Sequence, residues 1–117
     1  MSVRRVVANV ATEDMEAARR FYGELLGMEV AMDHGWIITL VGTGQARPQI
    51  SFASDGGSGT PVPDLSIEVD DLHALLETLL AAGHQPAYGP VREPWGVERF
   101  FVRDPFGRLL NILQHAA

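Results

Sequence analysis

The chain contains no cysteine, which excludes disulfide bonds, thiolate nucleophiles and cysteine-ligated zinc. This absence fits a cytoplasmic protein. Positive charge is also scarce, because nine Lys and Arg stand against fifteen Asp and Glu and give a net charge of −6. An acidic surface repels phosphate backbones, so we expect no nucleic-acid partner, whereas a cationic small molecule would be attracted.

The sequence also lacks long apolar runs. No stretch reaches the roughly 18 apolar residues of a membrane span, and no basic-then-apolar start predicts a signal peptide. We therefore expect no membrane partner. The 117 residues are 46% hydrophobic and 21% charged, which is ordinary globular composition for a single domain.

An internal duplication organises the chain. Apolar residues recur at helical spacing from about Asp14 to a stop at Gly27, and again from about Asp71 to a stop at Gly83. Each predicted helix follows one strand and precedes three, so both halves read βαβββ and predict an α+β fold. The predicted strands are 5–11, 28–33, 36–41 and 49–53, then 65–69, 85–89, 97–103 and 109–114.

Local turn signals mark the remaining boundaries. The stretch from Ser54 to Pro63 is rich in Gly, Ser and Pro and predicts a linker at about 54–63, between a module at about 1–56 and a module at about 62–117. Pro94 to Gly96 predicts a turn that carries Trp95, and Asp104 to Gly107 predicts a type I-like turn.

Strand alternation in the second half separates two faces. The apolar residues of 65–69 belong against the second helix, so Asp64, Ser66 and Glu68 point to the opposite face. Asn111 lies in the middle of the last predicted strand, whose side chains also alternate between two faces. It shares its face with Leu109 and Leu113.

The same alternation places candidates in the first half. Ser51 faces away from the first helix, because Ile50 and Phe52 suit the helix side. Asn9 shares a face with Val7 in the first strand. Trp36 shares a face with apolar strand residues, so core packing and ligand contact both remain open for its indole.

Aromatic residues near the end of the chain are further candidates. Trp95 either forms a stacking platform or packs against the neighbouring strand, and both interpretations remain open. Phe100 and Phe101 are adjacent on a strand and face opposite ways, so only one of them, here Phe101, lines the polar face. Phe21 and Tyr22 have helical core spacing and are interpreted as structural.

Two carboxylates on one face are an unusual feature. Asp64 and Glu68 repel each other unless solvent or a cation screens them. They therefore predict attraction of a cationic ligand, or a general base if Glu68 is desolvated. The alternative is that both are solvated and paired with Arg99 or Arg103.

Two motifs in this order resemble one protein family. VVANVATEDMEAARRFYGELLGMEV, with A-R-x-F-Y-x-x-x-L-G inside it, and DPFGRLLNILQ are similar to signatures of the vicinal oxygen chelate superfamily, also called glyoxalase/bleomycin resistance/dioxygenase. The PWG turn is most like the bleomycin-resistance branch. The resemblance implies two βαβββ modules forming curved mixed sheets around a cleft, with helices on the convex side.

The resemblance also bears on cofactors. Metal-binding members of the superfamily place one ligand on each of four strands, and the matching positions here are Val7, Ser51, Asp64 and Asn111. Three of these are uncharged and one has no ligand atom, so we expect neither a metal nor another cofactor. The histidines are interpreted as surface residues: His34, His73, His84 and His115.

Function follows as an expectation. The resemblance favours a metal-independent protein that binds a bulky aromatic or cationic natural product, as a homodimer that covers exposed Leu109 and Leu113. The alternative is a metal-free enzyme using Glu68 or Asp64 as acid or base. No catalytic residue is assigned. The expected ligand-binding residues are Trp95, Glu68, Asp64, Asn9, Ser51, Asn111, Trp36 and Phe101.

Overall fold

A computed structural model describes residues 1–116, and within it the chain forms two compact units. The N-terminal unit comprises Val7–Val62, and the C-terminal unit comprises Met1–Val6 together with the chain from Pro63 onward. The predicted α+β class is confirmed, because each half of the chain runs strand, helix and three strands. The first six residues group with the C-terminal unit.

The N-terminal unit is built on a four-stranded mixed sheet in the order β2-β3-β4-β1. β1 and β4 are parallel, whereas β2, β3 and β4 pair in antiparallel fashion. Its elements are β1 (Val3–Ala11), which belongs to this unit from Val7 onward, α1 (Met15–Ala18), the π-helix η1 (Arg19–Leu25), β2 (Glu29–Asp33), β3 (Ile37–Val41) and β4 (Gln49–Ala53).

The C-terminal unit repeats this plan in the order β5-β8-β7-β6, with β5 and β8 parallel. Its elements are β5 (Leu65–Val69), α2 (Leu72–Ala81), β6 (Tyr88–Glu93), β7 (Val97–Arg103) and β8 (Leu109–His115). The predicted strand at 85–89 was wrong in its position. The turn at 94–96 pairs Glu93 with Val97, so the hairpin requires β6 to run directly into that turn.

Both helices begin and end where the sequence predicts. Asp14 accepts a hydrogen bond from Ala17 N at 2.9 Å, and Asp71 accepts one from Ala74 N at 3.1 Å, so each carboxylate caps a helix N-terminus. Gly27 ends the first helix with a positive φ of 77°. Glycine suits this position because it carries no Cβ.

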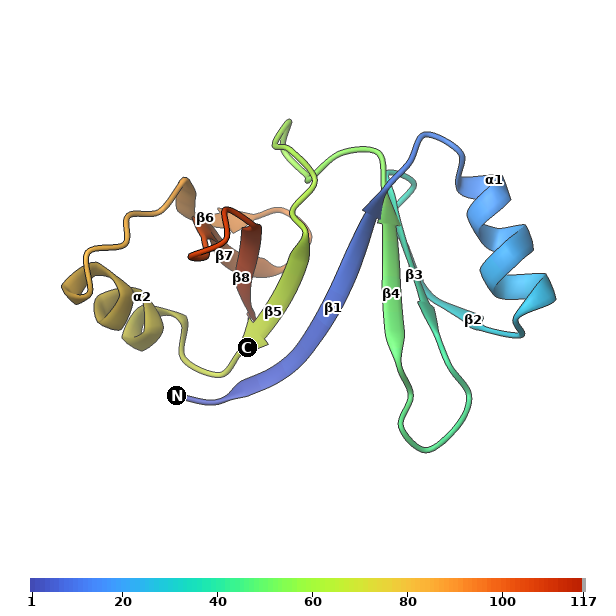
Figure 1. The fold of residues 1–117 in the computed structure, drawn as a ribbon, viewed down its shortest axis with the longest axis horizontal. Helices are drawn as coiled ribbons and strands as arrows, with labels where there is room; N and C mark the ends of the chain where they lie inside the picture. Colours follow the sequence, from blue (N-terminus) through green and yellow to red (C-terminus); the bar gives the residue numbers. More distant parts are fainter. Residues whose placement is uncertain (117) are drawn as a thin grey trace. The chain divides into compact units, whose positions relative to one another are not determined.

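Each helix covers one face of its own sheet (Figure 1). Around α2 the buried core is Val69, Leu72, Phe100, Val102 and Ile112. Around the first helix it is Ala18, Ile38, Leu40 and Phe52. Val69 and Phe52 lie on the helix side, as the strand alternation predicts. The opposite face of each sheet is therefore where polar side chains gather.

One expected core residue lies outside. Phe21 is 53% exposed, although Tyr22 packs on Phe52 with ring centroids 4.7 Å apart. The cause is the π-helix, in which Leu26 N donates to Phe21 O at 3.0 Å and widens the turn. The wider turn shifts the helical phase, so Leu25 and Leu26 also point to solvent.

Leu109 and Leu113 were expected to be exposed, and this was wrong. They are only 6% and 7% exposed. β8 lies between β5 and β7, so side chains of both neighbouring strands cover those of β8.

The predicted linker is an ordered loop, and all of it except Pro63 belongs to the N-terminal unit. Asp55 Oδ2 accepts hydrogen bonds from Gly57 N at 3.0 Å and Gly59 N at 3.2 Å. Gly56 N donates to Thr60 O at 2.9 Å. A Cβ on Gly56 would lie 2.0 Å from the Pro61 carbonyl oxygen, so the loop is too tight there for any other residue. Among residues 1–116, no helix is both long enough and apolar enough to cross a membrane.

A core phenylalanine and a surface phenylalanine provide a matched test of this packing. Phe100 is fully buried and Phe106 is 85% exposed. We expect Phe100→Ala to lower the free energy of unfolding by about 3–5 kcal/mol, and Phe106→Ala to change it by less than about 0.5 kcal/mol. Urea denaturation of both variants checks this. Equal losses would contradict the assigned core.

Candidate functional site

The sheet face opposite α2 in the C-terminal unit presents a regular grid of side chains. Strand register aligns Phe101, Asn111 and Ser66 in one row across β7, β8 and β5. In the next row, Leu113 is aligned with Arg99 on one side and Glu68 on the other. Polar and aromatic groups from distant parts of the sequence thus meet on one surface.

Asn111 lies at the centre of this face. Its side-chain Nδ2 donates to Ser66 Oγ at 3.1 Å, and only 9% of the residue is exposed. Its Oδ1 is buried and has no hydrogen-bond partner among the described residues. A buried carbonyl oxygen without a donor costs free energy. No described residue supplies the donor that this oxygen needs.

Glu68 is already paired. Its carboxylate lies 3.1 Å from Arg5 Nε on β1 and 3.1 Å from His115 Nδ1 on β8. These two partners differ from Arg99 and Arg103, which the alternative interpretation had named. The role of His115 was missed because it was interpreted as a surface residue. Extending the strand alternation from Asn111 to the end of β8 would have placed it on this face.

Asp64 connects two strands. Its Oδ2 accepts a hydrogen bond from Leu109 N at 2.8 Å, and its own N–H donates to Leu109 O at 2.8 Å. The other carboxylate oxygen lies 3.8 Å from Arg108 Nη1 at the surface. These contacts fasten the start of β5 to the start of β8. The carboxylate is thus committed to the backbone.

Trp95 belongs to an aromatic box around a buried arginine. The Arg99 guanidinium carbon lies 5.0 Å from the Trp95 ring centre, 4.8 Å from that of Phe101 and 5.4 Å from that of Tyr88. Arg99 Nε and Nη2 contact Glu93 Oε2 at 2.8 and 2.6 Å, and Tyr88 donates to the same oxygen at 3.1 Å. The packing interpretation of Trp95 therefore holds for its face toward Arg99.

The candidates of the N-terminal unit lie in their own sheet. Ser51 is the register partner of Asn9 on β1 and of Thr39 on β3. The hydroxyls of Ser51 and Thr39 are 2.7 Å apart and buried. Trp36 is half-buried before β3 and stacks on His34, with ring centroids 6.3 Å apart.

The four positions that match the superfamily's metal ligands do not fit a divalent metal. Val7 is buried and has no ligand atom. The Ser51 hydroxyl is bonded to Thr39, and Asp64 accepts a backbone hydrogen bond. Asn111 is a weak neutral ligand. In residues 1–116, no three His, Asp or Glu side chains gather closely enough to hold a metal ion.

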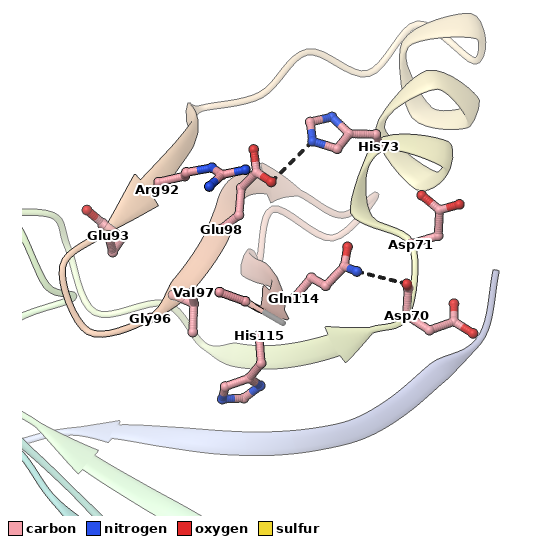
Figure 2. A pocket seen from close by; sticks show the side chains of 11 residues that line it. Asp70, Asp71, His73, Arg92, Glu93, Gly96, Val97, Glu98, Gln114 and His115 are labelled. Atoms are coloured by element: carbon pink, nitrogen blue, oxygen red, sulfur yellow. Dashed lines mark hydrogen bonds and ion pairs between the residues drawn. The ribbon is translucent and has the colours of Figure 1, made fainter.

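A cavity of about 780 Å³ opens on the α2 side of the C-terminal unit. Figure 2 shows His73 pointing to Glu98 across it, at 3.2 Å, and Gln114 bonded to the Asp70 carbonyl. A backbone hydrogen bond from Ser2 lowers the pKa of the Asp70 carboxyl. The His115 side chain projects away from these groups, although this residue, which belongs to the Asn111 sheet face, also lines the cavity.

Comparison with protein families matches residues 4–112 to the Glyoxalase/Bleomycin resistance protein/Dioxygenase superfamily. The chain belongs to this superfamily. The family expectation from the two sequence motifs is thereby confirmed, whereas the bleomycin-resistance branch stays a prediction. A comparison with curated proteins found no match.

Several solved structures share the superfamily fold. A methylmalonyl-CoA epimerase from Streptomyces coelicolor, with 2-nitronate-propionyl-CoA bound, is 18% identical (TM-score 0.72), covering 99% of this chain and 100% of that one. The enzyme of the same name from Mycobacterium tuberculosis is 22% identical (TM-score 0.65; 98% and 88% covered). A Legionella pneumophila structure described as NAD-dependent benzaldehyde dehydrogenase is 13% identical (TM-score 0.73; 95% and 99% covered). Such low identities support the fold alone.

The Arg99–Glu93 pair makes a strong stability prediction. Both side chains are 3% exposed, so Glu93→Ala removes the carboxylate that balances a buried cation. We expect a loss of about 3–5 kcal/mol in the free energy of unfolding. Glu24→Ala breaks an exposed pair with Arg20 and should cost less than about 1 kcal/mol. Urea denaturation of both variants checks this, and similar losses would contradict the burial.

Proposed function

We propose that this superfamily member is a metal-independent binding protein for a bulky, planar natural product, of the bleomycin-resistance type. Its ligand contacts the sheet face of the C-terminal unit that carries Asn111, Glu68 and Phe101. Sequestration of an antibiotic is the activity that such a protein would supply. Two observations support this proposal. The four positions that match the superfamily's metal ligands do not fit a metal, and the net charge of the chain is negative.

The observation that carries the proposal is the unpartnered Oδ1 of Asn111. Buried polar groups in proteins nearly always have a hydrogen-bond partner, so an orphaned acceptor calls for an explanation. A ligand N–H or O–H would satisfy it. The expected ligand therefore presents a hydrogen-bond donor to the middle of β8 while its apolar ring system covers the neighbouring rows.

The charges on this face refine the ligand class. Arg5 and His115 compensate Glu68, so this carboxylate offers a cation less than an unpaired acid would. The overall negative charge still attracts cations from a distance at low salt. Local recognition accordingly rests on the Asn111 acceptor, and long-range attraction rests on the whole surface.

The α2-side cavity is the weaker candidate for the ligand. Its volume falls in the usual range for ligand pockets. Its His73 and Glu98 side chains bond to each other, and its Gln114 amide bonds at both ends, to Leu72 N and to Asp70 O. The polar groups of these three side chains are therefore already satisfied within the chain.

Asn111→Leu should separate binding from stability. It removes the orphaned acceptor, so we expect unchanged or higher thermal stability without ligand. Affinity for a donor-bearing planar ligand should fall by about 5- to 150-fold, which corresponds to ~1–3 kcal/mol. A panel of aromatic antibiotics, titrated by calorimetry and Trp fluorescence, supplies the ligand.

Gln114→Leu is the matched control. Gln114 is an amide on the same strand, but it faces α2 and is bonded at both ends. We expect it to lower stability by about 1–3 kcal/mol and to leave affinity unchanged. If Asn111→Leu lowers stability and spares affinity, the Asn111 amide is structural and the proposal fails.

A metal-free enzyme is the second candidate, and the contact between His115 and Glu68 favours it. The imidazole is 54% exposed, and Nδ1 lies 3.1 Å from the Glu68 carboxylate. A carboxylate in this position orients an imidazole and holds the proton on Nδ1, so the outer nitrogen is free to act as a general base. Arg5 in turn holds Glu68 in place. Asp64, being committed to the backbone, is the weaker base.

Deuterium exchange tests this second candidate. A bound compound incubated with the protein in heavy water should gain deuterium at an acidic C–H position, as seen by mass spectrometry. His115→Gln should slow the exchange at least tenfold and leave affinity intact. Unchanged compound with no exchange would support sequestration alone.

A further inference from the structure

The immediate neighbours of Asn111 on the polar sheet face are mostly apolar. Strand register places Phe101 of β7 on one side of it and Ser66 of β5 on the other. Leu109 and Leu113 are the next residues on the same face of β8. Of these four neighbours, only Ser66 carries a polar side-chain group, and this residue is half-buried.

The more distant polar side chains of this face are engaged elsewhere. They lie on β5 and β7, two residues along from Ser66 or from Phe101. Each has its own partners: Asp64 bonds to Leu109 N, Glu68 to Arg5 and His115, Arg99 to Glu93, and Arg103 to Gly107 O. Ser66 is therefore the neighbour that can hold the Asn111 amide.

The contact between Asn111 and Ser66 decides which end of the amide is presented. A side-chain amide has two orientations, which exchange its oxygen and its nitrogen. Here Nδ2 donates to Ser66 Oγ at 3.1 Å, and Oδ1 is buried without a partner among the described residues. In the reverse orientation the hydroxyl would donate to Oδ1, and Nδ2 would take the presented position. The same asparagine would then offer a donor in place of an acceptor.

We propose that Ser66 is a specificity-determining residue, which makes Asn111 select ligands with a hydrogen-bond donor and reject isosteres with only an acceptor. This role of Ser66 rests on the proposed function, because it concerns the oxygen that recognises the ligand. The ligand class is thereby narrowed to planar ring compounds that carry a ring N–H or a phenolic O–H. A ring oxygen in the same place would face Oδ1, and both acceptors would remain unpaired.

Indole and benzofuran are the probes for this selectivity, because they are planar bicycles of nearly equal size. Indole has an N–H where benzofuran has a ring oxygen. We expect the wild type to bind indole about tenfold more tightly than benzofuran, as measured by nuclear magnetic resonance titration. A wild type that binds the two probes equally well overturns the proposal.

Ser66→Ala should abolish this preference. Without the hydroxyl, the amide is free to turn and present Nδ2 to the benzofuran oxygen, so the two probes should bind with nearly equal affinity. Ser66→Thr retains a hydroxyl and should retain the preference. A merely structural role of Ser66 would weaken both probes by the same factor, so an unchanged ratio of affinities in Ser66→Ala overturns the proposal.

The wild type without ligand supplies a further measurement if Ser66→Ala does not fold. Nuclear Overhauser contacts should join the Nδ2 protons of Asn111 to the β protons of Ser66, because the amide nitrogen faces the hydroxyl. Absence of these contacts overturns the proposal.

Asn111→Leu separates the role of Ser66 from the proposed function. If this variant binds indole as tightly as the wild type, or if the wild type binds neither probe, the proposed function fails and the role of Ser66 fails with it. If Asn111→Leu weakens the binding of indole whereas Ser66→Ala keeps the preference, only the role of Ser66 fails.

Discussion

The pairing of β8 on both of its edges is the constraint on which the C-terminal unit depends. β5 runs parallel to it and β7 antiparallel, so a single strand sets the positions of side chains from two others. Asp64 secures the parallel partner through its two contacts with Leu109. A slip of one residue would exchange Asn111 with Ile112, placing an amide in the α2 core and an isoleucine on the polar face. The register of β8 against β5 and β7 therefore determines which side chains form the candidate site.

Local patterns in the sequence predicted much of this architecture. Helix starts at Asp14 and Asp71 follow from a carboxylate that reaches backbone N–H groups three residues away. Strand alternation assigned Ser51, Glu68 and Asn111 to the faces they occupy. Both signals act over a few residues, and so a single sequence reveals them.

Contacts between distant residues could not be predicted in the same way. Glu68 is paired with Arg5, which lies far away along the chain, and no local pattern connects them. Trp95 was left open because only tertiary structure brings Arg99 against its ring. Phe21 was misplaced because the sequence shows helical spacing but not the change from an α-helix to a π-helix. The strand 85–89 was misplaced because hairpin pairing, rather than composition, fixed β6.

The net charge of the chain does not describe the charge on the candidate sheet face. The chain is strongly acidic, yet the acidic residue best placed on the candidate face has two basic neighbours. Buried charge in the aromatic box is balanced as well, by Glu93. Net charge thus describes how molecules approach this protein from solution. It does not describe the candidate sheet face, where basic side chains lie against the carboxylate of Glu68.

The ordered loop of Ser54 to Pro63 has a consequence for engineering the chain. A Gly-rich joint would ordinarily be the first choice for inserting a tag or a reporter domain. Here Gly56 and Gly57 are buried and the loop is fastened by Asp55, so an insertion would break a folded structure. The connection between β3 and β4, exposed from Thr43 to Arg47, is the better entry point for added sequence.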